Sequence, residues 1–316
     1  MIVARARLHP SALACVALAI GIGGCSLCRR PDPPPGPPAE RTGPPSRVHQ
    51  VFVQGRFVEI TIEVPLEPPG PKPAVISYIA DARVPLLEAG IVVVSYRQHW
   101  ELLRGLPRAS PPPDPKPEPP AKTYGTWLLA SPTPKTVGQS YFRLIDANAT
   151  GTLPQVLDAM AGEPEIDPTR IGILGHSTNA FVALQGVAGQ PRIRVAAIVA
   201  GCGDYHTFLH ESSLAMKGEP LDLDPAYSAW LREREVRWHP RRVLHAAVFM
   251  VNGRDDDTVP ADCARTTARA LRRAYRRLGA PERFRFVLVD SGHTFNDAAR
   301  AEVYAWLRRW LVDAPR

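Results

Sequence analysis

The chain has 316 residues, of which 45% are hydrophobic, and its 38 Lys and Arg exceed its 31 Asp and Glu, giving a formal net charge of +7. This length and hydrophobic content suffice for one α/β domain with extensions, so a second domain is not required. The excess of arginine occurs without a nucleic-acid motif. It therefore favours solvated helix faces over a nucleic-acid surface, although anionic envelope surfaces attract such a charge.

The first 24 residues have the pattern of an export signal. Arg5 and Arg7 precede an apolar stretch at residues 11–22, and small residues lead up to Cys25. About twelve apolar residues are too few to span a bilayer. The pattern resembles a bacterial lipoprotein signal, which implies lipidation of Cys25 and an exported, membrane-anchored protein of the cell envelope. An ordinary signal peptide and an uncleaved anchor are the alternatives.

Two segments are rich in proline. Residues 25–47 have almost nothing to bury, and such a composition predicts a semi-rigid, extended linker ahead of a domain at residues 48–316. The second segment, residues 107–120, falls inside that domain. Because structureless stretches of this length are uncommon within a compact domain, we expect a surface excursion between two elements.

The remaining pattern is that of an α/β fold. Residues 58–64 alternate apolar and polar, and a turn at 54–56 leads back to 49–53, which predicts an antiparallel hairpin. Short apolar runs at 74–79, 90–95 and 195–200 lie between helical stretches. Runs of this kind indicate parallel strands that are buried on both faces.

A serine lies where a buried strand is expected to turn into a helix. The sequence Gly-His-Ser-Thr-Asn at 175–179 follows the apolar run 171–174 and precedes the apolar run 180–184. Such a turn holds the hydroxyl of Ser177 above the sheet edge, beside the N–H groups of a helix N-terminus. This context predicts a nucleophile elbow.

Two further motifs follow buried strands. The run 246–251 leads into the Gly-x-x-Asp-x-x-Val-Pro pattern that contains Asp256, and the run 284–290 leads into Ser-Gly-His-Thr-Phe, which contains His293. The chain order Ser, Asp, His, with each residue just beyond a strand, is the α/β-hydrolase order.

These features resemble the α/β-hydrolase superfamily, most closely its dienelactone-hydrolase-like and acyl-peptidase-like branch, from about residue 48 to the C-terminus. The segment Glu-Ile-Asp-Pro-Thr-Arg-Ile-Gly at 165–172, the Asp256 loop and residues 292–295 carry the resemblance. It implies a Ser-His-Asp acyl-transfer site on a mostly parallel, eight-stranded sheet with helices on both faces. An excursion at 203–245 would form a small cap, whose aromatic residues either line a substrate pocket or pack the cap onto the core.

The expected roles follow from the chemistry of acyl transfer. A serine hydroxyl needs a base to take its proton, and His293 would take it and return it to the leaving group, while Asp256 would orient the imidazole. Asp255, Asp257 and Asp204 are rival carboxylates, but the Val-Pro spacing favours Asp256.

The oxyanion hole departs from the family pattern. One donor is expected to be the backbone N–H of Thr178, and the other to come from the loop after the strand at 74–79, at Asp81 or Ala80. The family usually has His-Gly in that loop, and a second glycine where this chain has Asn179.

The sequence implies no cofactor and shows no zinc-site spacing. Cys202 and Cys263 form either a disulfide or two free buried thiols. We therefore expect a serine carboxylic-ester hydrolase that forms an acyl-enzyme, acts on a small ester or acyl substrate, and binds no nucleic acid.

Three alternatives remain for this function: an acyl-peptidase, an acyltransferase and a catalytically silent binding protein. The peptidase alternative is weakened because such enzymes usually carry a propeller domain, for which the segment ahead of residue 48 leaves little room.

Overall fold

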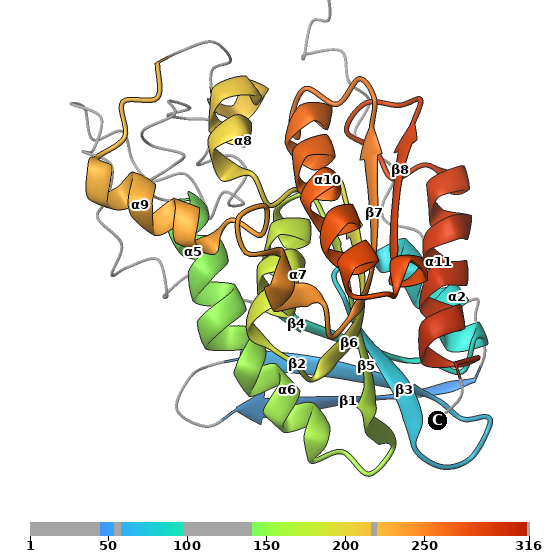
Figure 1. Ribbon diagram of the computed structural model, residues 1–316. Coiled ribbons are helices and arrows are strands. Elements are labelled where there is room, and N and C mark those ends of the chain that lie inside the picture. The colour runs from blue at the N-terminus through green and yellow to red at the C-terminus, as the bar shows by residue number, and fades with distance from the viewer. Residues whose placement is uncertain (1–44, 54–57, 98–140, 216–219, 315–316) are drawn as a thin grey trace, which may run out of the picture. The chain divides into compact units, whose positions relative to one another are not determined.

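The computed structural model describes residues 45–53, 58–97, 141–215 and 220–314 (Figure 1). The predicted signal peptide, most of the predicted linker and the proline-rich segment 107–120 lie outside these residues. The first strand, β1, is Ser46–Val53, so Ser46 and Arg47 belong to a strand and not to the linker. Ser46 and Arg47 belong to β1 because their backbones pair with Pro65 and Val64. Nothing in the sequence indicated this, since the predicted strand began only at residue 49.

Eight strands form one sheet in the order β1-β2-β4-β3-β5-β6-β7-β8. After β1 they are β2 (Val58–Pro65), β3 (Lys72–Ser77), β4 (Val92–Arg97), β5 (Ile166–His176), β6 (Ile193–Val199), β7 (Ala247–Gly253) and β8 (Phe284–Val289). β2 is antiparallel to both of its neighbours, and every other pair is parallel. The predicted fold class, a mostly parallel eight-stranded α/β-hydrolase sheet, is confirmed.

The helices cover both faces of this sheet (Figure 1). The helical elements are η2 (Ala80–Ala82), α2 (Arg83–Glu88), α5 (Phe142–Ala147), the π-turn η5 (Asn148–Thr152), α6 (Leu153–Ala161), α7 (Thr178–Gly189), α8 (Tyr205–Glu211), η6 (Ser213–Ala215), α9 (Pro225–Arg234), η7 (Pro240–Val243), α10 (Ala261–Arg277), η8 (Pro281–Arg283) and α11 (Asp297–Leu311). Side chains of α6, α7 and α10 pack on one face, and side chains of α2 and α11 pack on the other. None of the helices in the described part of the chain is long and apolar enough to cross a membrane.

The segment 203–245, predicted as a cap, contains α8, η6, α9 and η7. Its aromatic residues Tyr205, Phe208 and Tyr227 are buried in a cluster with Phe142 and Phe181 from α5 and α7. The rings of Phe142 and Tyr205 stack with their centroids 4.2 Å apart. These aromatic side chains therefore pack the segment onto the core, which was one of the two roles predicted for them.

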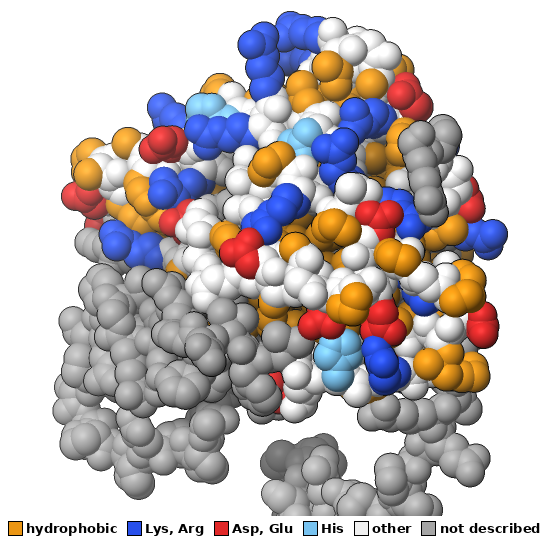
Figure 2. Space-filling view, turned by 90° about the horizontal axis from the view of Figure 1, so that it is seen from below, with side chains coloured by type: hydrophobic (Ala, Val, Ile, Leu, Met, Phe, Trp, Pro, Cys, Tyr) orange, Lys and Arg blue, Asp and Glu red, His pale blue; other side chains and the backbone are white. Residues whose placement is uncertain are grey.

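Figure 2 shows the molecule from below relative to Figure 1, and Lys and Arg side chains are more numerous in the upper half of that view, with Asp, Glu and apolar side chains among them. β7 and β8 begin beside one another, since Val248 pairs with Phe284, and the chain reaches β8 from the end of α10 through η8. The arginine-rich end of α10 therefore lies at the end of the sheet where β7 and β8 begin.

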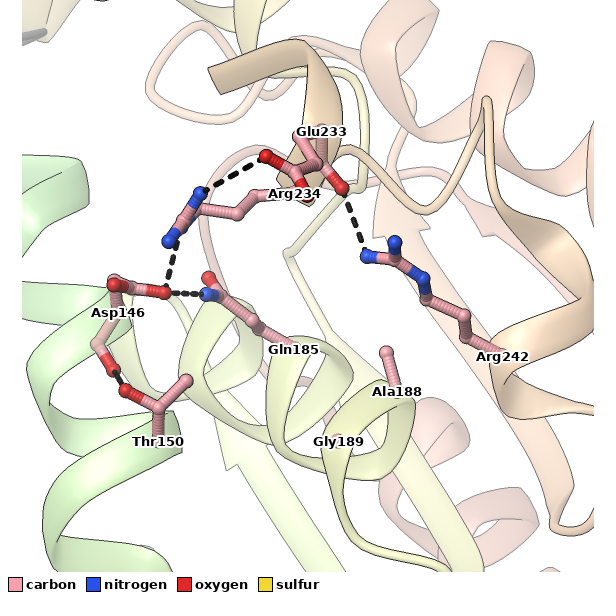
Figure 3. A pocket seen from close by; sticks show the side chains of 8 residues that line it. All are labelled: Asp146, Thr150, Gln185, Ala188, Gly189, Glu233, Arg234 and Arg242. Atoms are coloured by element: carbon pink, nitrogen blue, oxygen red, sulfur yellow. Dashed lines mark hydrogen bonds and ion pairs between the residues drawn. The ribbon is translucent and has the colours of Figure 1, made fainter. Parts of the chain in front are cut away.

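A polar pocket of about 170 Å³ lies beside the C-terminal half of α7 (Figure 3). Asp146 accepts hydrogen bonds there from the Gln185 amide at 2.5 Å and from the Arg234 guanidinium at 2.8 Å. Gln185 lies eight residues along the helix from Ser177, about 12 Å at 1.5 Å per residue. The pocket is thus separate from the serine, and its charged groups pair with one another.

Candidate active site

Ser177 occupies a strained turn between β5 and α7. Its φ is 57° and its ψ is −126°, a backbone conformation that costs of order 1–3 kcal/mol for a residue other than glycine. Its N–H donates to the Val199 carbonyl at 3.0 Å, and its own carbonyl accepts from Ala180 N at 2.8 Å. These bonds hold the serine side chain at the end of the strand, as the predicted elbow requires.

The tight turn depends on Gly175. A Cβ at this position would lie 2.1 Å from the backbone oxygen of Asn179, so a side chain cannot fit without a backbone shift. Asn179 itself, which replaces the family's second glycine, is accommodated half-buried at the start of α7. The next residue of α7, Ala180, is closely approached by Gly201, where an added Cβ would lie 2.4 Å from the Ala180 Cβ.

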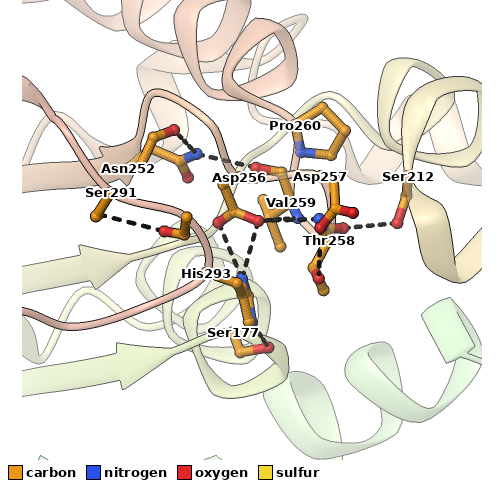
Figure 4. Close-up of polar contacts among 12 residues, drawn as sticks. Ser177, Ser212, Asn252, Asp256, Asp257, Thr258, Val259, Pro260, Ser291 and His293 are labelled. Carbon is orange, nitrogen blue, oxygen red and sulfur yellow. Dashed lines mark hydrogen bonds and ion pairs between the residues drawn. The ribbon is translucent and has the colours of Figure 1, made fainter. Parts of the chain in front are cut away.

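His293 joins the serine to Asp256 (Figure 4). Its Nε2 lies 2.9 Å from Ser177 Oγ, and its Nδ1 lies 2.9 Å from Asp256 Oδ2 and 3.1 Å from Oδ1. The three residues that the sequence analysis selected, on the loops after β5, β7 and β8, thus form one chain of hydrogen bonds. In this order Nδ1–H donates to the carboxylate, and Nε2 accepts from the serine hydroxyl.

The carboxylate of Asp256 is fixed by its own loop. Its side chain is fully buried, and Oδ1 accepts from the backbone N–H groups of Thr258 at 3.0 Å and Val259 at 2.8 Å. The Asn252 amide donates to the Val259 carbonyl at 2.9 Å and closes the loop from the other side. These two backbone donors set the direction in which the carboxylate faces His293.

The rival carboxylates have other surroundings. Asp255 and Asp257 are exposed. Asp204 is fully buried, caps α8 by accepting from Thr207 N at 3.2 Å, and pairs with the Arg237 guanidinium. Its carboxylate therefore serves the start of α8 and an internal ion pair.

The two expected oxyanion donors lie at helix starts. Thr178 is the first residue of α7, and Asp81 lies in η2, so neither N–H has a helical carbonyl four residues before it. The Asp81 carboxylate is 65% exposed and pairs with Arg300, at 3.0 Å. This ion pair compensates the negative charge that the sequence analysis identified as unfavourable beside an oxyanion.

Two residues near the serine were missed in the sequence analysis. Tyr141 is buried, and its hydroxyl donates to Thr178 Oγ1 at 3.1 Å. Its position follows a long proline-rich region and has no motif to mark it. His176 immediately precedes the serine, and its ring centroid lies 5.2 Å from that of His293. Burial, followed by the charge of His293, lowers the pKa of His176 below its usual value.

A second Ser-His-carboxylate chain occurs between α8 and α9. His206 Nδ1 lies 2.8 Å from Glu235 Oε1, and its Nε2 lies 2.8 Å from Ser228 Oγ. Ser228, however, lies inside α9, where its N–H donates to the Asp224 carbonyl at 2.8 Å. The residue after it, Ala229, lies beyond the first turn of α9, so its N–H is engaged within the helix and Ser228 lacks the free amide that follows Ser177 at the start of α7. This chain of bonds links two helices.

The two alternatives for the cysteines have a direct outcome. Cys202 and Cys263 are both free and buried, so the thiol alternative holds and the disulfide alternative does not. Burial, together with a hydrogen bond to Cys202, raises the pKa of the Cys263 thiol well above its usual value. No cluster of three or more His, Cys, Asp or Glu suited to a metal occurs within the ranges that the structure describes.

Known proteins resemble this chain in sequence and in fold. YtaP of Bacillus subtilis (strain 168), which carries the name of a hydrolase, is 25% identical over 155 residues, which cover 49% of this chain and 50% of YtaP. The chain therefore matches about half the length of this relative. A Klebsiella pneumoniae protein described as a dienelactone hydrolase superposes with a TM-score of 0.55 at 17% identity, over 85% of this chain and 100% of that one. Pyrococcus horikoshii acylaminoacyl peptidase gives a TM-score of 0.59 at 12% identity, over 88% of this chain and 43% of the peptidase.

The prolyl oligopeptidase family, peptidase family S9, matches residues 152–314, which is more than half of the chain. That range begins just ahead of α6 and includes the loops of Ser177, Asp256 and His293. The chain belongs to the prolyl oligopeptidase family, and it has the α/β-hydrolase fold.

Proposed function

We propose that the protein hydrolyses carboxylic esters through an acyl-enzyme on Ser177, with His293 as general acid and base and Asp256 as the orienting carboxylate. The observation that carries this proposal is the continuous hydrogen-bond chain from Ser177 Oγ through both ring nitrogens of His293 to a buried carboxylate. The strained turn at Ser177 supports it, since strain at a helix start serves to present a nucleophile.

The proposed reaction has two halves. Ser177 Oγ attacks the ester carbonyl carbon while His293 Nε2 takes the hydroxyl proton, and the backbone N–H groups of Thr178 and Asp81 bind the oxyanion. His293 then gives the proton to the alkoxide, and the alcohol leaves. In the second half His293 deprotonates a water as it attacks the acyl carbonyl; the bond between the acyl carbon and Ser177 Oγ then breaks, His293 returns the proton to Oγ, and the acid leaves.

An acyl-peptidase activity is the second candidate, because the family is one of peptidases. The likeness in fold to a protein described as a dienelactone hydrolase, whose substrate by that name is a lactone, supports the ester. Transfer of the acyl group to an acceptor other than water uses the same residues, and it would appear as a new ester when an alcohol is added to the assay.

Labelling by a fluorophosphonate tests the nucleophile without knowledge of the substrate. The wild-type protein should be labelled at Ser177, and Ser177→Ala should abolish the label while the circular dichroism spectrum is retained. Ser291→Ala is the matched control, because Ser291 lies in the His293 loop and its hydroxyl donates only to a neighbouring carbonyl, at 3.3 Å. A folded wild-type protein that takes no label at Ser177 would support a binding protein.

A panel of substrates separates the two enzymatic candidates. We expect p-nitrophenyl esters of short acids to be turned over with a higher kcat/KM than acyl-peptide anilides of matched size. A higher value for the anilides would reverse the assignment and leave Ser177 as the nucleophile.

We also propose that the protein is an exported lipoprotein anchored through Cys25, on the strength of its N-terminal sequence. Several acyl chains on one terminus give stable attachment where a single chain does not. Cys25→Ser should release active enzyme from the membrane fraction or trap the precursor. Recovery of the wild-type protein in soluble form, with an N-terminus downstream of Cys25, would contradict lipidation and leave export alone.

A further inference from the structure

A row of arginines covers the solvent side of α10. Arg269, Arg272, Arg273, Arg276 and Arg277 are all exposed, and their spacing of i, i+3, i+4, i+7 and i+8 places them along one face of the helix. The opposite side of α10 is buried against the sheet through residues such as Leu271 and Tyr275. The row is therefore a continuous strip of guanidinium groups held on a rigid element.

These charges have no acidic partners among the described residues. Arg269 donates to Thr266 Oγ1 at 3.1 Å and Arg276 to the Arg272 carbonyl at 3.3 Å, and both acceptors are neutral. The acid of the helix, Asp262, lies in its first turn and pairs with Arg265 at 2.7 Å. The positive charge of the strip is thus left for a partner outside the domain.

The surface continues beyond the helix. The Tyr275 hydroxyl links α10 to the end of η7 and the segment that follows it, by donating to the carbonyls of Val243 and Ala246, each at 2.9 Å. In η7 itself, Arg241 is exposed. Two large apolar side chains adjoin these arginines in the chain: Trp238, 51% exposed, lies just before η7, and Leu278, 49% exposed, follows α10. We call the arginine row, Arg241, Trp238 and Leu278 together the basic face.

The basic face and the serine belong to opposite ends of the sheet. β7 ends at the loop of Asp256, and α10 returns from there over 17 residues, about 25 Å at 1.5 Å per residue (Figure 1). The arginine row occupies the second half of this helix, next to the beginning of β8. A flat surface that contacts the basic face would leave Ser177 on the far side of the domain.

We propose that the basic face docks the domain onto an anionic phospholipid bilayer and that the candidate active site then faces the aqueous phase. Basic side chains near such a bilayer contribute about 1 kcal/mol each, and a tryptophan beside them suits the interfacial layer. The exposed Trp238 and Leu278 favour a bilayer over a nucleic acid, since a duplex offers phosphates but no apolar layer to receive them. This surface is independent of Ser177 chemistry and of acylation at Cys25.

Vesicle binding tests the proposal in the full-length chain carrying Cys25→Ser, so that no acyl chain contributes. The protein should co-sediment with phosphatidylcholine–phosphatidylglycerol vesicles far more than with phosphatidylcholine vesicles, and less as salt is raised. Adding Arg273→Glu and Arg277→Glu should weaken binding to the anionic vesicles by at least about 30-fold, from two lost contributions of the size given above.

The matched control reverses two charges at the other end of the domain. Arg254 and Arg265 pair with Asp290 and Asp262, at 2.8 and 2.7 Å, and lie near the start of α10. Arg254→Glu with Arg265→Glu changes the net charge equally but should retain most of the binding. Equal losses of vesicle binding in both double variants would show that only the net charge matters, and would overturn the proposal. Equal binding to both kinds of vesicle, or tighter binding to duplex DNA than to the anionic vesicles, would also overturn it.

The orientation has its own readout. Turnover of a water-soluble ester should be unchanged when the protein is bound to anionic vesicles, because the serine end stays in water. Inhibition of that turnover by the vesicles, relieved by Arg273→Glu with Arg277→Glu, would show that the bilayer covers the serine and would overturn the orientation.

Discussion

Replacing Asp256 by Asn should disable the base without disturbing the loop. Thr258 N and Val259 N both donate to Oδ1, at 3.0 and 2.8 Å, so the amide oxygen of Asn takes that place. The amide NH₂ then takes the place of Oδ2, which lies 2.9 Å from His293 Nδ1. Because NH₂ is a donor, Nδ1 must accept, and the imidazole proton moves to Nε2.

An imidazole with its proton on Nε2 cannot take the proton of Ser177, 2.9 Å away. A wrong tautomer of this kind costs about 10⁴ in kcat, or about 5.5 kcal/mol of transition-state stabilisation at 1.36 kcal/mol per tenfold. The assay is steady-state hydrolysis of a p-nitrophenyl ester, with thermal unfolding measured on the same sample. We expect the melting temperature to change little, because both backbone hydrogen bonds to the side chain persist.

Two variants test whether another carboxylate, Asp257 or Asp204, orients His293 instead. Asp257→Asn removes an exposed charge from the same loop and should keep the wild-type kcat. Asp204→Asn weakens a buried ion pair with Arg237, so it should lower the melting temperature while the folded fraction keeps its kcat. Full activity of Asp256→Asn, or loss of kcat in folded Asp204→Asn, would refute the assignment of the orienting carboxylate.

Three further predictions concern packing, pH and the thiols. Gly175→Ala should abolish hydrolysis and lower the melting temperature, because its Cβ would lie 2.1 Å from a backbone oxygen, whereas Gly189→Ala, with nothing within 4 Å, should preserve both. For Glu235, burial would raise the pKa, but hydrogen bonds from His206 outweigh it and the net pKa lies below the usual 4.5. The stability that the ionised Glu235 contributes is therefore present above pH 4.5 and is lost as pH falls through the lowered pKa. The difference in unfolding free energy between wild type and Glu235→Gln should thus become smaller in acid, and a difference that grew in acid would contradict the direction of the pKa shift. Native Cys263 should resist iodoacetamide and react once guanidinium unfolds the chain, as mass spectrometry of tryptic peptides would show; rapid native alkylation would contradict its burial.

The strands could be predicted because their signals are local. Alternation along residues 58–64 and the unbroken apolar runs of the parallel strands are properties of neighbouring residues, and every strand of the sheet was expected near its observed place. Most boundaries moved by no more than about three residues, as for β4, which is Val92–Arg97 where 90–95 was expected, but β5 begins at Ile166, five residues before the expected run 171–174. Backbone pairing with β2 continues to Arg97, beyond the last apolar residues.

The residues of the candidate site likewise include some that local sequence signals predict and some that they do not. Ser177, Asp256 and His293 were selected because each follows a strand, and parallel strands bring their carboxyl ends to one edge. The place of Asp204 could not be foreseen, because its partner Arg237 is 33 residues away and no repeating pattern connects the two. Tyr141, 37 residues from Thr178, is a similar case. Such contacts depend on how helices pack over the sheet.

The separation of the three site residues along the chain has a consequence for biosynthesis. Ser177 and His293 are 116 residues apart, and His293 is carried by the loop after β8, the strand added last at the edge of the sheet. A growing polypeptide that has emerged through the Asp256 loop carries Ser177 and Asp256 but not His293. Under the proposed mechanism, the serine therefore stays inert until the His293 loop has been synthesised and β8 has docked, so that hydrolysis begins only once the sheet is complete.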